Sequence, residues 1–156
     1  MNEDMQASIR VLIMTLLGMP SGSVRPSDNQ PTEGDSYAIM SEPDMQPLGW
    51  AGDSVDAYQT GIASFTIDFI GNNAGYLAGA LKKAMQSYYA SDILQGLNLG
   101  FVDCSKARNL SMIELEKTTR YQVVLTLSYS FQYDALADIG EIGNFDNINI
   151  RLIAEQ

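Results

Sequence analysis

One alternating segment constrains the fold more than any other part of the chain. Residues 119–133 read TRYQVVLTLSYSFQY, in which aromatic and aliphatic residues occupy every second position. This alternation predicts a β-strand with one buried face, because successive side chains of a strand point to opposite sides. Strands in globular proteins usually span about five or six residues. We therefore expect the far end of this long strand to project beyond the body of the domain.

The opposite face of the same strand is polar and almost uncharged. It presents Arg120, Gln122, Val124, Thr126, Ser128, Ser130 and Gln132. A strand face that stays in solvent usually carries Lys and Glu. An uncharged polar face suits a wet protein interface, where a charge would cost desolvation. The composition of this face therefore favours self-assembly of the chain.

The rest of the sequence predicts helices and strands that surround this segment. Helices are expected at residues 3–17, 73–87 and around 89–95, where apolar side chains recur at helical spacing. Strands are expected at 35–42, 61–71, 97–104 and 147–154, whereas residues 18–34 have the composition of a loop. Consecutive strands late in the chain favour hairpins. The sequence thus predicts an α+β fold, a mostly antiparallel twisted sheet with helices packed on one face, in a single domain of residues 1–156.

Residues 43–61 are expected to form a long loop or arm. A loop beyond about 15 residues in a compact domain is usually functional or disordered. This segment contains Trp50, the only tryptophan of the chain, beside glycines and acidic residues. Two interpretations remain open: Trp50 belongs to a binding arm, or it covers an apolar edge of the domain.

The segment DFIGNNAGYLAGALKKAM, residues 68–85, has the strand–glycine–helix order of a phosphate-binding loop. A P-loop requires G-x-x-x-x-G-K-[ST], and a dinucleotide-binding turn requires G-x-G-x-x-G. Here the glycines recur every fourth residue, so Gly75 and Gly79 share one helix face and permit close packing. Asn72 or Asn73 can cap the helix. We interpret the segment as a turn into a helix and expect no nucleotide cofactor.

The composition excludes most catalytic chemistry. The chain has no histidine, which removes the commonest general base and metal ligand. The acidic clusters match neither a calcium loop nor a catalytic pair, and the single Cys104 reads as a small buried residue in a reducing compartment. We expect no catalytic, cofactor-binding or metal-binding residues, and hence no enzyme.

The charge balance limits the possible partners. The chain has 19 acidic and 9 basic residues and a formal net charge of −10. Tight DNA binding neutralises phosphates with Lys and Arg, which are few here. No run of apolar residues is long enough for a transmembrane helix, and the acidic start does not read as a secretory signal. We therefore expect a soluble protein made in the cytoplasm, with neither membrane contact nor direct DNA binding.

Several motifs, taken in order, resemble a family of tailed-bacteriophage proteins. They are VRP at 24–26, FTIDFIG at 65–71, NNAGYLAGALKKAM at 72–85, Gly96-Leu97, and ARNLSMIELEKTTRYQVVLTLSYSF at 107–131. The series covers about residues 9–133. It is similar to the bacteriophage neck or tail terminator family, whose members join tail to head.

The resemblance implies a structural virion protein, assembled in the bacterial cytoplasm. It implies a ring, expected to be a hexamer, at the head-proximal end of the tail, where it ends tube growth and meets the tail tube protein and the head connector or adaptor. DNA would pass through the lumen without specific binding. Expected interface residues are Arg25, Trp50, Arg120, Gln122, Thr126, Ser128, Ser130 and Gln132, from the long strand, the 43–61 arm and the 20–34 loop.

Three other hypotheses remain open at this point. The chain could be another tail component, such as a tube or head–tail adaptor protein with the same α+β architecture. It could be a small hydrolase or ligand-binding module that uses carboxylates, which nucleotide or metal binding would support. It could be a DNA-binding protein, which salt-sensitive retention on duplex DNA would support.

Overall fold

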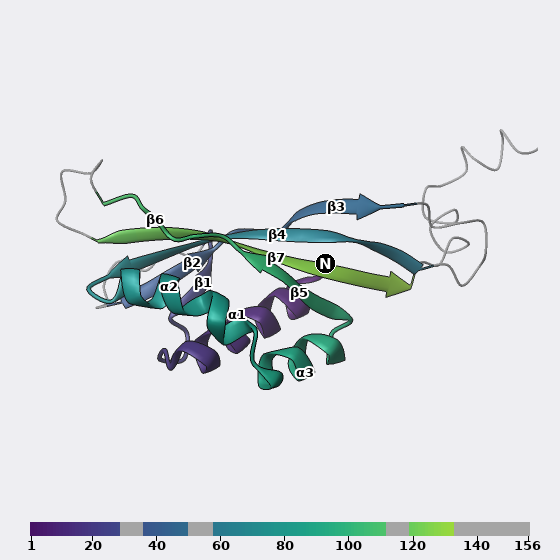
Figure 1. The fold of residues 1–156 in the computed structure, drawn as a ribbon, viewed down its shortest axis with the longest axis horizontal. Helices are drawn as coiled ribbons and strands as arrows, with labels where there is room; N and C mark the ends of the chain where they lie inside the picture. The colour runs from purple at the N-terminus through teal and green to yellow at the C-terminus, as the bar shows by residue number, and fades with distance from the viewer. Residues whose placement is uncertain (29–35, 50–57, 112–118, 133–156) are drawn as a thin grey trace, which may run out of the picture.

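The computed structural model describes residues 1–28, 36–49, 58–111 and 119–132. In this part of the chain, three helices cover one face of a seven-stranded sheet (Figure 1). The helices are α1 (Glu3–Leu17), α2 (Ala74–Met85) and α3 (Tyr88–Gly96). The strands are β1 (Val24–Pro26), β2 (Ser36–Met40), β3 (Asp44–Leu48), β4 (Tyr58–Gly71), β5 (Leu99–Cys104), β6 (Arg108–Asn109) and β7 (Arg120–Gln132). The predicted α+β class is confirmed.

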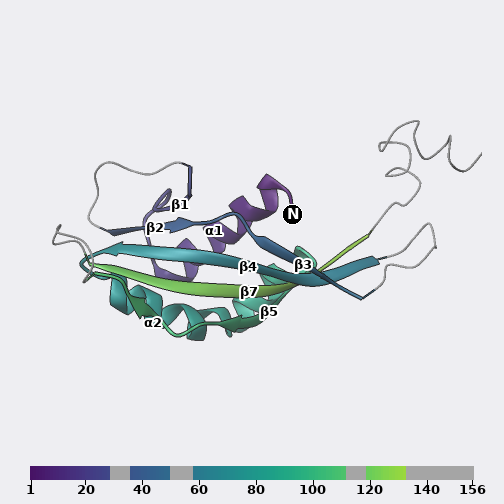
Figure 2. The same ribbon diagram turned by 90° about the horizontal axis from the view of Figure 1, so that it is seen from above.

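The sheet is built around the long antiparallel pair of β4 and β7. These strands pair from Tyr58 opposite Gln132 to Ile70 opposite Arg120. The strand order is β1-β2-β4-β7-β5, with β3 also paired to β4 and β6 also paired to β7. Among the described strands, only β1 and β2 pair in parallel, and the other pairings are antiparallel. From above, β4 and β7 run side by side along the whole length of the sheet (Figure 2).

The alternation in the sequence places the core between this pair and the helices. Phe65, Ile67 and Phe69 of β4 are fully buried, and so are Val123, Leu125 and Leu127 of β7. The helices bury the facing residues Ile9, Leu12, Ile13, Leu77, Ala78, Leu81, Met85, Ala90 and Leu94. Each fully buried aliphatic or aromatic side chain contributes about 1.5–3 kcal/mol, so this single layer of contacts holds the helices on the sheet.

Local signals define the ends of two helices. In α1 the Asn2 side chain accepts a hydrogen bond from the Met5 amide, and Gly18 ends the helix in the left-handed conformation at φ 64°. In α3 the Ser87 side chain accepts from the Ala90 amide. Both caps satisfy backbone groups that the helix itself leaves without partners.

The expected side-chain cap of α2 is wrong. Asn73 occupies the N-cap position, but its side chain makes no cap hydrogen bond. Its backbone lies at φ −100° and ψ 10°. Capping side chains normally require the extended conformation at this position, which Asn2 and Ser87 have.

The structure also corrects two regions that were predicted to be loops. Residues 24–26, within the expected 18–34 loop, form β1, and residues 44–48, within the expected 43–61 loop, form β3. Strand β4 begins at Tyr58 rather than at 61, and the two-residue β6 was not predicted. These short edge segments contain proline and polar residues, so their pairing with a neighbouring strand, and not their composition, makes them strands. The expected strand at 147–154 lies outside the described residues.

Candidate assembly surface

The face of β4 and β7 that points away from the helices is here called the open face. Figure 1 shows all three helices on the other side of the sheet. Its central rows pair Thr60 with Ser130, Ile62 with Ser128, Ser64 with Thr126, and Thr66 with Val124. The sequence predicted the β7 half of this surface. The β4 half was missed as a surface, although the alternation in residues 61–71 already separates Ser64 and Thr66 from the buried phenylalanines.

The open face is uncharged except at one end. There the Asp68 carboxylate accepts one hydrogen bond from the Arg120 guanidinium at 2.9 Å and another from the Gln122 amide at 3.0 Å. The Asp68 side chain is 15% exposed and the Arg120 side chain 35% exposed, so this ion pair is partly shielded from water. Arg120 and Gln122 therefore hold β4 and β7 together within the chain, besides lying on the expected interface.

Beyond the helices, the sheet narrows to an extension that we call the arm. It consists of β3, residues 58–62 of β4 and residues 128–132 of β7. The ends of β4 and β7 reach past α3 (Figure 1). On its helix-facing side, the rings of Tyr129 and Phe131 stack with centroids 5.2 Å apart and an interplanar angle of 20°. Tyr129 lies over Gly61 of the paired strand, where a side chain would leave no room for the ring. The predicted projection of the long strand is thus present.

The remaining expected interface residues are separated from one another. Arg25 lies on β1 opposite Ile39 of β2, and its Nε donates to the Gly22 carbonyl at 2.9 Å. Gln132 ends β7 opposite Tyr58, at the tip of the arm. Trp50 lies outside the described residues. Thr126, Ser128 and Ser130 lie together on the open face, so the structure brings together the β7 residues but not Arg25.

The helical side exposes apolar side chains that the sequence did not reveal. Tyr76, Tyr88 and Tyr89 are 78%, 93% and 53% exposed, and Val11 is 56% exposed. Between α1 and α3 a groove of about 310 Å³ is lined by Ala7, Ser8, Val11, Leu12, Thr15, Tyr89 and Ile93. Helical periodicity identifies the buried stripe of a helix. It does not show which exposed apolar residues form a surface that another molecule could cover.

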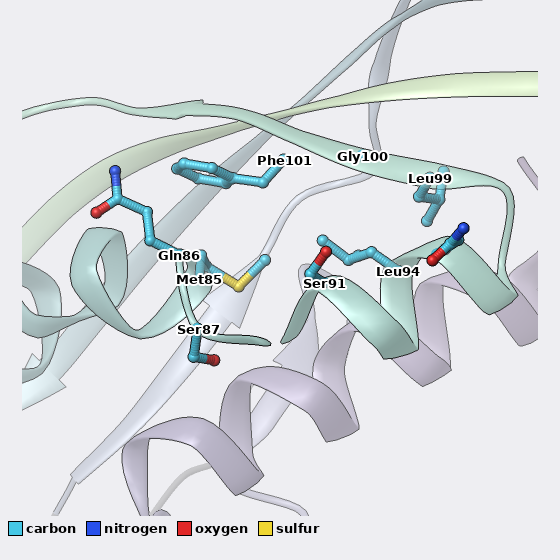
Figure 3. Close-up of a pocket in the computed structure, with 9 residues that line it drawn as sticks. Met85, Gln86, Ser87, Ser91, Leu94, Leu99, Gly100 and Phe101 are labelled. Atoms are coloured by element: carbon cyan, nitrogen blue, oxygen red, sulfur yellow. The ribbon is translucent and has the colours of Figure 1, made fainter. Parts of the chain in front are cut away.

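A second hollow of about 470 Å³ lies between the α2–α3 junction and β5. Figure 3 shows Met85, Ser91, Leu94 and Phe101 around it. Its lining contains only apolar, amide and hydroxyl side chains, with no group that titrates near neutral pH. The walls of this hollow therefore hold no general acid or base that could activate the Ser87 or Ser91 hydroxyl as a nucleophile, and the hollow offers no candidate catalytic centre.

The two helix glycines singled out in the sequence differ in their surroundings. A side chain at Gly75 would lie 3.1 Å from the Tyr121 ring, so close packing at Gly75 is confirmed. At Gly79 no atom of the described residues lies within 4 Å of such a position, so the predicted close packing at Gly79 is wrong for this part of the chain.

Reactive and metal-binding groups are few in the described part of the chain. Burial raises the pKa of the Cys104 thiol to about 11, so the thiol is protonated at neutral pH and unreactive. The exposed Lys82 donates a hydrogen bond to Asp103 and thereby lowers the pKa of that carboxyl. The residues described hold no group of three Asp, Glu or Cys side chains that could bind a metal. Nor does any described helix have the length and apolarity to cross a membrane.

A family model described as "Phage neck terminator protein" matches residues 3–155, nearly the whole chain. No curated protein matches the sequence.

Proposed function

Because the chain belongs to the phage neck terminator family, a family of structural phage proteins, we propose that it forms a ring at the head-proximal end of a phage tail. In this position the ring ends growth of the tail tube and joins the tail to the head connector. The match to residues 3–155 is the observation that carries the proposal, since it spans the helices, the sheet and the arm together. The protein would be assembled in the bacterial cytoplasm and retained in the virion neck.

The open face and the arm support a ring made of identical copies. In a cyclic ring each contact is heterologous, so one surface of a subunit meets a different surface of its neighbour. The open face offers hydroxyl and aliphatic side chains without unpaired charge, which lowers the desolvation cost of burying it. The arm extends past the helices and can reach an adjacent subunit (Figure 1). A hexamer is the proposed stoichiometry.

The charge of the chain supports a lumen through which DNA passes without being held. A formal net charge of −10 per subunit becomes a large negative charge when copies are arranged around one axis. Such a field repels phosphate and keeps the DNA mobile. The proposed partners are therefore further copies of the chain, the tail tube protein and the connector or adaptor protein.

A phage that lacks this gene tests the proposal. We expect DNA-filled heads and separate tails of irregular, excessive length, and restoration of joined particles when the chain is supplied from a plasmid. Joined particles with tails of normal length in the absence of the chain would refute the terminator function. Complete absence of tail tubes would instead assign the chain to the tube itself.

A further inference from the structure

On each long edge of the sheet, a serine lies between two consecutive strands and pairs with the neighbouring long strand in the same way. Between β2 and β3, the Ser41 amide donates to the Thr66 carbonyl at 2.9 Å, and the Ser41 hydroxyl accepts from the Thr66 amide at 2.9 Å. Between β5 and β6, the Ser105 amide donates to the Val124 carbonyl at 2.9 Å, and the Ser105 hydroxyl accepts from the Val124 amide at 2.8 Å. Thr66 and Val124 are themselves paired across β4 and β7. The two serines therefore end the same transverse row of the sheet at opposite edges.

The residues that follow these serines carry opposite charges at matching offsets. The sequence from the first serine is Ser41-Glu42-Pro43-Asp44, and from the second it is Ser105-Lys106-Ala107-Arg108. Each edge has a charge one residue and three residues beyond its serine, acidic on one edge and basic on the other. All four charged residues are exposed.

These four charges have no ionic partner in the described part of the chain. The ion pairs found there join Arg10 to Glu3, Lys82 to Asp103, and Arg120 to Asp68. Two acids on one edge and two bases on the other thus remain available to another molecule. Because both signs belong to the same chain, a second copy complements each edge.

Neither edge is suited to adding a further backbone strand. On the acidic edge, β3 contains Pro47, which has no amide hydrogen to donate. On the basic edge, the β5–β7 register shifts between Phe101 and Asp103. Prolines and bulges of this kind prevent edge-to-edge strand pairing. A contact between these edges therefore depends on side chains, and its charges decide its strength.

We propose that Glu42 and Asp44 of one copy bind Lys106 and Arg108 of the next copy, so that the two opposite edges add ion pairs to the heterologous contact, besides the open face and the arm. This inference rests on the ring of the proposed function and assigns the residues that hold neighbouring subunits together.

The register also sets how neighbouring copies are offset. Asp44 lies in the row of Ser64, and Arg108 lies opposite Gln122 in the row of Asp68. At about 3.3 Å per residue, bringing the acidic pair opposite the basic pair requires a shift along the strands on the order of 10 Å. Copies in a closed ring lie at the same height along its axis, so this shift requires strands that are tilted to the axis, as in closed sheets generally.

Charge reversal on each edge separately tests the contact. Variant one is Glu42→Lys with Asp44→Lys, and variant two is Lys106→Glu with Arg108→Glu. Association is measured by sedimentation velocity and native mass spectrometry at about 50 mM and about 500 mM salt, which differ strongly in electrostatic screening. A matched control, Asp4→Lys with Asp92→Lys, changes the net charge as variant one does, at exposed acids of helices α1 and α3. Circular dichroism establishes that each variant is folded. If a double variant does not fold, the single variant Glu42→Lys or Lys106→Glu is measured in its place.

We expect the wild-type chain to associate at low salt and to weaken at high salt. Each edge variant alone should associate roughly tenfold more weakly or worse, because two attractions become two repulsions. The control should associate as the wild type does. An equal mixture of the two edge variants should associate again, because the copies then alternate and every contact is complementary. An alternating ring closes only with an even number of copies.

Three results would overturn this inference. They are edge variants that associate as well as the wild type, a mixture no better than either variant alone, and a wild-type chain that stays monomeric at low salt at every concentration. None of these results removes the chain from the neck, so a ring seen in particles together with any of them would mean that other surfaces join the subunits. Loss of the neck location itself would refute the proposed function instead.

Discussion

Replacing Gly61 by alanine should destabilise the protein through one specific contact in the arm. A Cβ atom at this position would lie 2.5 Å from the Gln46 carbonyl oxygen and 2.5 Å from Cζ of the Tyr129 ring. The carbonyl belongs to the paired strand β3 and cannot move without breaking that pairing. The Tyr129 ring stacks on Phe131, so its displacement also disturbs the helix-facing side of the arm.

The expected loss combines two opposing effects. Forcing an extra carbon into a filled site costs about 3 kcal/mol at the upper end of the usual range. Replacing glycine by alanine in a strand recovers up to about 1 kcal/mol, because the unfolded chain loses conformational freedom. The unfolding free energy should therefore fall by about 2 kcal/mol, which corresponds to a Tm lower by about 4–8 °C for a domain of this size.

Urea unfolding followed by tyrosine fluorescence and circular dichroism measures this loss. Gly79→Ala is the matched control, because a side chain there meets no atom within 4 Å and helix propensity should raise stability by about 0.5–1 kcal/mol. In a Tyr129→Ala background the cost of Gly61→Ala should shrink by about 1 kcal/mol. A Gly61→Ala protein as stable as the wild type, or a cost that Tyr129→Ala leaves unchanged, would refute this account of the arm.

Three further predictions concern the open face, its charged end and the thiol. Thr126→Lys should leave the Tm within about 2 °C of the wild-type value, because the side chain lies on the surface of the isolated chain. The same change should abolish complementation of a phage that lacks the gene, because the lysine must be desolvated in the interface. Full complementation would contradict the role of the open face. Asp68→Asn should lower the unfolding free energy, measured in urea, by about 1–2 kcal/mol, because the Arg120 charge loses its carboxylate partner. As a control, Asp44→Asn at an exposed position should change the unfolding free energy of the isolated chain by less than about 0.5 kcal/mol. Equal losses in the two variants would contradict a stabilising role of the Asp68 hydrogen bonds. The pKa of the Cys104 thiol is raised to about 11 in the folded protein, whereas in the unfolded chain it is about 8.5. The contribution of this thiol to the free energy of unfolding is therefore complete below about pH 8.5 and is lost as the pH rises toward 11. Iodoacetamide at pH 8 should accordingly label Cys104 far faster in urea than in buffer, and equal labelling rates would contradict its burial.

The sequence predicted those parts of the fold that depend on regular alternation or helical spacing. An apolar residue occupies every second position in residues 63–69 of β4 and 121–131 of β7, and the buried residues follow these positions. The helix at residues 3–17 was located to the residue from its apolar spacing. These features are local, so a single sequence contains them.

Features that depend on which strands become neighbours could not be predicted in the same way. β1, β3 and β6 are short and rich in polar residues or proline, and they are strands only because β2, β4 and β7 lie beside them. The polar face of β7 was found, but its continuation across β4 requires the register that pairs Ser64 with Thr126. The matching charges after Ser41 and Ser105 are visible in the sequence, yet they gain meaning only when the two serines lie on one row of the sheet.

Electron cryomicroscopy of intact particles tests the central claim most directly, with this chain traced into the density of the neck. The account predicts a single ring of this chain between the last ring of the tail tube and the head connector. A chain stacked repeatedly along the tail, or absent from the particle, would contradict it.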